Sequence, residues 1–196
     1  ATREFERVHG RVPGGELVVL GLGRLGGGAL THASDLDVVY LFTGTFSGES
    51  DGRRPLGVTH YFNRLAQRVT AALSVPTAEG ALYEVDTRLR PQGAQGPLAV
   101  SFDSFARYQC EEAWTWEHMA LTRARPLTGS RNARAELQAI IASVLDRARE
   151  LALHGEDVGE IPLEALGPDD AAVARIGQFG DSLMEGDALV GKMDLR

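Results

Sequence analysis

Residues 17–42 constrain the fold more than any other part of this 196-residue chain. They contain two apolar runs, residues 17–20 and 38–42, each bounded by glycine or aspartate. Such continuous apolar runs are typical of strands that are buried on both faces. A glycine-rich turn with one basic residue lies between the runs, and Asp35 and Asp37 lead directly into the second one. The polar groups of this stretch are therefore confined to the connection between two buried strands.

The two aspartates indicate a metal site. If the second strand begins by Asp35, the carboxylates of Asp35 and Asp37 leave the same face of that strand. Like charges this close repel each other, and a divalent cation with oxygen ligands, most suitably Mg²⁺, lets both acids stay ionised. The Asp-x-Asp pattern alone is weak evidence, because aspartate is common at strand starts and in turns. The glycine turn before it and a third acid on a later strand strengthen the prediction.

The glycine turn also matches the dinucleotide-binding pattern GxGxxG at residues 21–26. That fold needs a crossover helix before its second strand and an acid about twenty residues past the glycines. Only residues 27–34 separate Gly26 from Asp35, and Glu49, at about the right distance, lies in a loop-like segment. The spacing therefore argues against a dinucleotide fold. We expect the turn to present backbone N–H groups and the start of a short helix to phosphate, opposite the metal-binding acids.

Composition and charge narrow the class of protein. The chain is 43% hydrophobic and 24% charged, as in ordinary globular proteins, and its single Cys110 excludes an internal disulfide or a multi-cysteine metal site. Acidic and basic residues balance at 17 each up to Ala152, so the net charge of −7 comes from Leu153 onward, which argues against a nucleic-acid-binding surface. The chain shows neither a membrane-spanning run nor an N-terminal signal pattern, which predicts a cytoplasmic protein. Because it does not begin with Met, we expect a piece of a longer protein.

Periodicity predicts the remaining elements. Residues 57–73, 101–112 and 135–152 have helical spacing, and residues 1–16 are expected to be the frayed end of a helix followed by a turn. Residues 43–55 are expected to form a mobile loop, and periodicity is poor beyond residue 154. Residues 81–90 alternate like a strand that Pro91 ends. One face of that strand would carry a third carboxylate beside two guanidinium groups: Glu84, Asp86, Arg88 and Arg90.

Four segments, in this order, resemble the adenylyltransferase domains of the bifunctional glutamine synthetase adenylyltransferase/adenylyl-removing enzyme: GLGRLGG, SDLDVVYLF, YEVDTRLRPQGAQGP and YQCEEAWTWEHMALTRARPL. The resemblance covers roughly residues 16–152. That family has two such domains in one chain, one that attaches AMP to a tyrosine of glutamine synthetase and one that removes it by phosphorolysis. Residues 112–118, EAWTWEH, are similar to the attaching, C-terminal domain. The resemblance implies an α/β (α+β) nucleotidyltransferase fold at residues 1–128, a mixed sheet flanked by helices, and a helical segment at 129–196.

The resemblance also implies the roles of individual residues. Asp35, Asp37 and Asp86 would be the catalytic and metal-binding acids, with Asp86 helping to deprotonate the attacking tyrosine hydroxyl. The nucleotide-binding residues would be Arg24, Gly26, Gly27, Ser34, Arg88 and Arg90. The cofactor would be Mg²⁺ and the substrate ATP. The partners would be glutamine synthetase and, through the larger enzyme, a PII-type signalling protein, with no nucleic acid and no membrane.

Several points stay open at this level. Arg90 could bind phosphate or pair with Asp86 as a structural bridge. Trp114 and Trp116 are read as core anchors rather than nucleotide-stacking groups, and the histidines at positions 32 and 118 as structural rather than catalytic. The family usually has an acid shortly after the double glycine, where this chain has Gly28 and Ala29, and the tail from residue 153 lacks the family's glycine-rich, acid-containing segment. The alternatives to AMP attachment are AMP removal and a catalytically silent nucleotide-binding regulatory domain.

Overall fold

A computed structural model describes residues 2–32, 34–44, 48–76, 78, 80 and 83–153. The elements in chain order are α1 (Thr2–His9), β1 (Leu17–Gly21), α2 (Gly23–Gly26), β2 (Leu36–Phe42), α3 (Val58–Leu73), β3 (Val85–Asp86), the 3-10 helix η1 (Gly93–Gln95), β4 (Ala99–Ser101), α4 (Phe102–Glu111), α5 (Thr115–Leu121), β5 (Arg125–Pro126) and α6 (Arg131–Leu153). The helices predicted at residues 57–73, 101–112 and 135–152 are confirmed as α3, α4 and α6.

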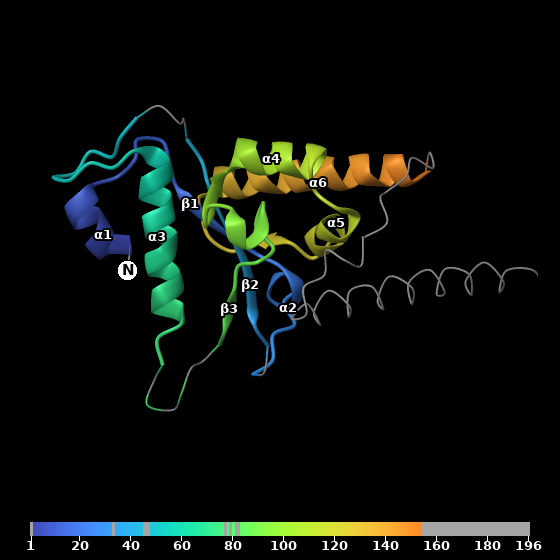
Figure 1. Ribbon diagram of the computed structural model, residues 1–196, viewed down its shortest axis with the longest axis horizontal. Coiled ribbons are helices and arrows are strands. Elements are labelled where there is room, and N and C mark those ends of the chain that lie inside the picture. The colour runs from blue at the N-terminus through green and yellow to red at the C-terminus, as the bar shows by residue number, and fades with distance from the viewer. Residues whose placement is uncertain are drawn as a thin grey trace, which may run out of the picture.

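The strands form one mixed sheet in the order β3-β2-β1-β5, with β4 also paired to β2. The two central strands are antiparallel, as are β1 and β5, whereas β3 and β4 both run parallel to β2. Residues 36 and 37 of β2 pair with β3, and residues 40–42 pair with β4, so β3 and β4 share one edge of β2. Helix α3 provides the crossover that this parallel pairing requires (Figure 1).

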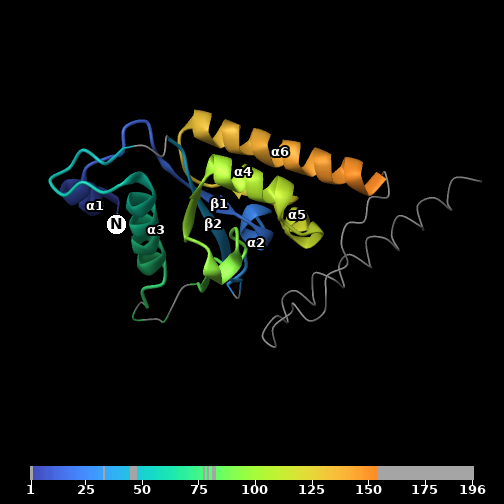
Figure 2. The same ribbon diagram turned by 45° about the horizontal axis from the view of Figure 1, so that its top comes forward.

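Helices cover both faces of the sheet (Figure 2). Val39 and Leu41 pack with α4, α5 and α6, whereas Val38, Tyr40 and Phe42 pack with α1 and α3. These five residues of β2 are at most 2% exposed, which confirms that this strand is buried on both faces. Together the two cores fix the position of β2, and with it the start of the strand that carries Asp37.

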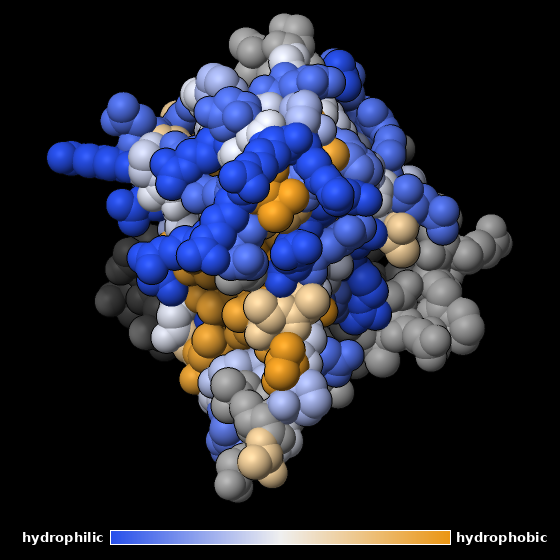
Figure 3. All heavy atoms as spheres, turned by 90° about the vertical axis from the view of Figure 1, so that its left-hand side faces the viewer, coloured by the Kyte–Doolittle hydropathy of each residue, from blue (hydrophilic) through white to orange (hydrophobic). Residues whose placement is uncertain are grey.

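The N-terminal segment, expected from the sequence to be a frayed helix end, forms α1 and packs into the core. Phe5 of α1 is 1% exposed and contacts Tyr61 of α3 edge to face, with 5.0 Å between ring centroids. The loop that was expected to be mobile is joined to this segment, since the N–H groups of Asp51 and Gly52 donate to the carbonyl oxygens of Arg11 and His9. The face on which α1 and α3 lie is mainly hydrophilic, with a smaller hydrophobic area (Figure 3).

The prediction of one strand over residues 81–90 is confirmed at Val85–Asp86 alone: residues 83–84 and 87–90 are outside the strand, and residues 81–82 lie outside the described part of the chain. The N–H of Arg88 donates to Asp86 Oδ1 at 2.8 Å, and the chain turns away from β2 there. Residues 87–98 leave the sheet, Gln92 adopts a positive φ of 61°, and the chain returns to the same edge as β4. The predicted strand face with Glu84, Asp86, Arg88 and Arg90 therefore does not form, because the chain leaves the sheet after Asp86.

The start of α6 belongs to the same core as the sheet. Its apolar stripe joins the cluster that contains residues of β1 and β2, and its members there are Ala133, Leu137, Ile141 and Val144. The predicted boundary at residue 128 stays a prediction, because residues 154–196 and the acidic tail lie outside the described part of the chain. None of the helices within the described residues is long and apolar enough to cross a membrane.

Candidate active site

The glycine turn brings the backbone of α2 against the start of β2. Leu22 donates its N–H to the carbonyl oxygen of Asp37 at 2.9 Å. Gly23 has a φ of +50°, and a Cβ at this position would lie 2.5 Å from Asp37 Oδ2. The one-turn helix α2 confirms the expected strand, turn and short helix. Glycine is required at position 23 because of both its backbone conformation and the adjacent carboxylate.

The residues predicted to lie along the triphosphate differ in their surroundings. Gly26 is buried, and a Cβ there would lie 2.1 Å from the carbonyl oxygen of Arg123, so close packing explains this glycine. Gly27 and Arg24 are exposed. Ser34 is buried, and its hydroxyl accepts a 3.0 Å hydrogen bond from the N–H of Thr31, which gives it a role in the turn before β2. Of these four residues, Gly27 and Arg24 are the ones open to a ligand.

Two of the three predicted acids are neighbours on paired strands, and the third precedes one of them in the chain. Asp37 and Asp86 are register partners in the parallel pair of β2 and β3, and Asp35 is exposed just before β2 begins at Leu36. Burial raises the pKa of the Asp37 carboxyl, and the negative charges of Asp86 and Asp35 raise it further. The positive charge of Arg88 acts in the opposite direction. The acids that sequence placed on two separate strands thus influence one another directly.

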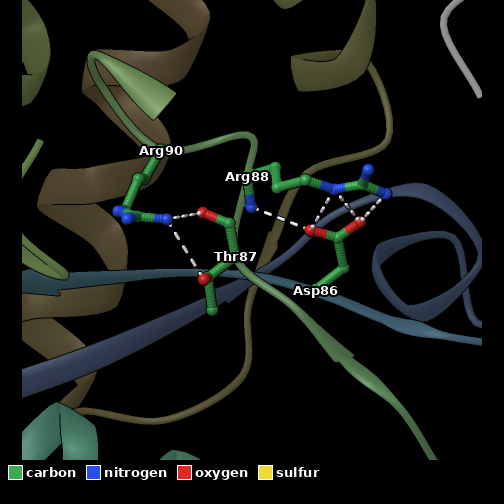
Figure 4. Close-up of polar contacts among 4 residues, drawn as sticks. All are labelled: Asp86, Thr87, Arg88 and Arg90. Carbon is green, nitrogen blue, oxygen red and sulfur yellow. Dashed lines mark hydrogen bonds and ion pairs between the residues drawn. The ribbon is translucent and has the colours of Figure 1, made fainter. Parts of the chain in front are cut away.

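Asp86 is paired with Arg88 (Figure 4). Arg88 Nη2 and Nε lie 2.6 and 2.9 Å from Asp86 Oδ2, and Nε also lies 3.1 Å from Oδ1. Burial alone would raise the pKa of Asp86, but the hydrogen bonds and charge of Arg88 outweigh it and hold the pKa below its usual value. The pair therefore keeps Asp86 ionised and occupies both of its oxygens.

The donor set suits a hard divalent cation, since all three side chains offer carboxylate oxygens. Among the described residues, however, no three His, Cys, Asp or Glu side chains are grouped so that they could hold a metal ion. Asp35 and Asp37 are the acids open to a cation as the side chains stand. Asp86 could join them once Arg88 has turned away, and the Arg88 side chain is 58% exposed and so able to move.

Arg90 holds the loop that follows β3. Its Nη1 donates to the carbonyl oxygen of Thr87 at 2.7 Å, and its Nη2 donates to that of Ala94 at 3.3 Å. Its Nε lies 3.4 Å from the carbonyl oxygen of Gly96 (Figure 4 shows the contacts with Thr87). Burial lowers the pKa of Arg90, and the charge of Asp86 partly offsets this effect. Arg90 therefore has a structural role, but its partners are backbone carbonyl groups. The arginine that pairs with Asp86 is Arg88.

Sequence reasoning missed a polar pair between α4 and α5, formed by the half-buried Tyr108 and the buried Glu117. Tyr108 donates its hydroxyl to Glu117 at 3.0 Å, and the Trp114 N–H donates to the same carboxylate at 2.9 Å. Burial raises the pKa of Glu117, whereas burial and the charge of Glu117 raise the pKa of Tyr108 to about 12. A glutamate in the first turn of a helix is a known capping signal, and Glu117 holds that position in α5.

The aromatic and histidine predictions have mixed outcomes. Trp114 is 43% exposed, so its interpretation as a core anchor is wrong. It is the residue before α5, and its backbone N–H donates to the Glu117 carboxylate. Trp116 is half-buried. His118 has a structural partner, since its Nε2 lies 2.8 Å from the carbonyl oxygen of Gln109, whereas His32 is exposed.

A mixed sheet with helices on both faces, a glycine turn after its first strand and acids on two neighbouring strands define a nucleotidyltransferase-like domain. The family model described as glutamate-ammonia ligase adenylyltransferase matches residues 3–140. The chain belongs to this family.

Individual relatives agree with the family match. The bifunctional glutamine synthetase adenylyltransferase/adenylyl-removing enzyme of Agrobacterium fabrum (strain C58 / ATCC 33970) is 50% identical over 156 residues, which are 79% of this chain and 16% of the relative. That of Rhizobium meliloti (strain 1021) is 48% identical over 159 residues, 81% of this chain and 16% of the relative. The corresponding enzyme of Pseudomonas syringae pv. tomato is 48% identical over 144 residues, 74% and 15% of the two chains. The chain thus spans a small part of the length of these relatives.

Proposed function

We propose that this domain transfers AMP from ATP to a tyrosine of glutamine synthetase and thereby regulates nitrogen assimilation. The observation that carries the proposal is the meeting of Asp35, Asp37 and Asp86 beside a glycine turn. Family membership supports it, because the matched relatives are named as glutamine synthetase adenylyltransferases and adenylyl-removing enzymes. The cytoplasm, where ATP and the acceptor enzyme meet, is the compartment we propose. A PII-type signalling protein is a proposed partner of the larger enzyme.

In the proposed reaction the tyrosine oxygen attacks the α-phosphorus of ATP. One phosphorus–oxygen bond forms to tyrosine, the bond to the leaving pyrophosphate breaks, and the hydroxyl proton passes to a carboxylate. Asp35, Asp37 and Asp86 would hold Mg²⁺, which supplies positive charge to the phosphate oxygens when it is bound. Arg88 would exchange Asp86 for phosphate, which frees the Asp86 carboxylate to accept the proton. Gly27 and Arg24 would lie along the phosphates.

The direction of the reaction is tested by supplying the two possible substrates separately. With unmodified glutamine synthetase and Mg–ATP, we expect release of pyrophosphate and labelling of the acceptor with AMP. With adenylylated glutamine synthetase and phosphate, we expect no ADP. ADP release without transfer would reverse the assignment, and nucleotide binding without either product would favour the silent regulatory domain. If the chain is inactive alone, the remaining part of the larger enzyme is added in both assays.

A further inference from the structure

The segment between α5 and α6 places two arginines against the glycine turn. Arg125 is on β5, where it is the register partner of Gly21, the residue that precedes the turn. Its Nη2 donates to the carbonyl oxygen of Leu25 at 3.1 Å and lies 4.0 Å from where a Cβ of Gly28 would be. The Cδ of Arg123 lies 3.9 Å from the corresponding position of Gly27. Both side chains therefore reach the exposed end of the turn.

The backbone fixes this arrangement. The carbonyl oxygen of Arg123 lies 2.1 Å from where a Cβ of Gly26 would be, so α2 and the segment at residues 123–125 fit together only because position 26 is glycine. Pairing of Gly21 with Arg125 and of Leu20 with Pro126 holds the segment to β1. Strand pairing and close packing thus hold the backbone of both arginines against the glycine turn, as a preformed binding site requires.

The charges of these arginines are not neutralised by acids within the described part of the chain. The ion pairs there involve Arg7, Arg11 and Arg88. Arg123 and Arg125 are both exposed, and the described hydrogen bond of Arg125 goes to an uncharged carbonyl group. Guanidinium groups with open N–H donors and no carboxylate partner favour an anion, and phosphate suits their planar geometry best.

We propose that Arg123 and Arg125 bind the β- and γ-phosphates of ATP at the end of the glycine turn opposite Asp37, an inference that rests on the proposed function. Asp37 lies at Gly23, where α2 begins, and the arginines lie at Gly27 and Gly28, just past its end and at least about 6 Å further along the chain. This separation spans more than one P–O–P link, so the acids and the arginines can contact different phosphates of one triphosphate chain. The acids then act where the reacting phosphate binds, and the arginines hold the leaving pyrophosphate.

Direct binding measurements test the proposal on the 196-residue chain. Mg–ATP, AMP and inorganic tripolyphosphate are titrated by calorimetry into wild type, Arg123→Gln, Arg125→Gln and the double variant. We expect affinity for ATP and tripolyphosphate to fall about tenfold for each arginine, whereas affinity for AMP changes little. The lysine variants should fall between wild type and glutamine, because lysine keeps the charge but loses the two-pronged contact. Arg134→Gln, an exposed arginine on α6, is the matched control.

Each outcome is decisive. Arg123→Gln is the variant that separates binding from folding, because no described hydrogen bond of its side chain is lost, and circular dichroism checks its melting temperature. Equal tripolyphosphate affinity in wild type and the double variant would overturn the arginine proposal. If both proteins also bind AMP and ATP normally, that result leaves the proposed function standing. If wild type binds tripolyphosphate but transfers no AMP even with the remaining part of the larger enzyme added, the arginine site stands and the proposed function fails. A loss confined to binding of glutamine synthetase would assign both arginines to the protein acceptor instead.

Discussion

Gly23 and Asp37 are in such close contact that a Cβ on the glycine would lie 2.5 Å from the Oδ2 of the aspartate. Gly23 also has a positive φ, as does Gly14, which has open space around the position of its Cβ. An alanine at either position would strain a left-handed backbone, but an alanine at position 23 would also collide with Asp37. Comparing the two substitutions therefore distinguishes the effect of the strain from the effect of the collision.

Gly23→Ala should reduce AMP transfer far more than it reduces stability. The added methyl displaces the Asp37 carboxylate, which is the flexible end of a side chain, while the left-handed backbone costs about 1 kcal/mol. Gly14→Ala should show the same loss in urea unfolding with unchanged transfer. Equal activity of both variants would mean that the position of the Asp37 carboxylate does not matter to the reaction.

Asp37→Asn should abolish Mg²⁺-dependent transfer and leave the fold intact. The substitution removes a carboxylate that the proposed cation needs, and it also removes repulsion with Asp86 and Asp35, so the free energy of unfolding at neutral pH should stay the same or rise. Asp103→Asn, at an exposed position in the first turn of α4, is the control. Mg²⁺-dependent turnover by Asp37→Asn would exclude Asp37 from the site.

Arg88 and Arg90 should respond oppositely to truncation. Arg88→Ala should weaken ATP binding by about 1.5–3 kcal/mol with a small change in stability, because its guanidinium is exposed and a charged hydrogen bond to phosphate is lost. Arg90→Ala should lose about 1–3 kcal/mol of unfolding free energy, because the carbonyl groups of the loop lose their donor. Urea unfolding and ATP titration of both variants measure the contrast, and the reverse result would exchange the two roles.

Glu117 should make the stability of the domain depend on pH. Burial raises its pKa in the folded state, so the folded chain holds this proton more tightly than the unfolded chain does. The stability contribution of this carboxyl is fully present below its unfolded pKa and is lost as pH rises through its folded pKa. Glu117→Gln should remove that fall, which urea unfolding across the pH range would detect, and Tyr108→Phe should keep it. An unchanged pH profile in Glu117→Gln would assign the dependence to another group.

The local part of the site could be predicted from sequence, and the non-local part only incompletely. The turn between β1 and β2 was readable because glycine spacing and apolar runs report on neighbouring residues. The extended reading beyond Asp86 failed because the Asp86 side chain captures the N–H of Arg88, a local bond that competes with strand pairing. The contact of Arg125 with Leu25 joins residues a hundred positions apart, and no periodicity encodes it.

The shortness of β3 has a consequence for how the third acid moves. With two residues in the sheet, β3 has few backbone hydrogen bonds to lose, so its edge of β2 should open locally long before the molecule unfolds. Slow amide exchange is then expected at the centre of β2 and fast exchange beside Asp86. The carboxylate that is paired with Arg88 is thus carried by a strand of two residues, which lets Asp86 change partners while the two central strands stay in register.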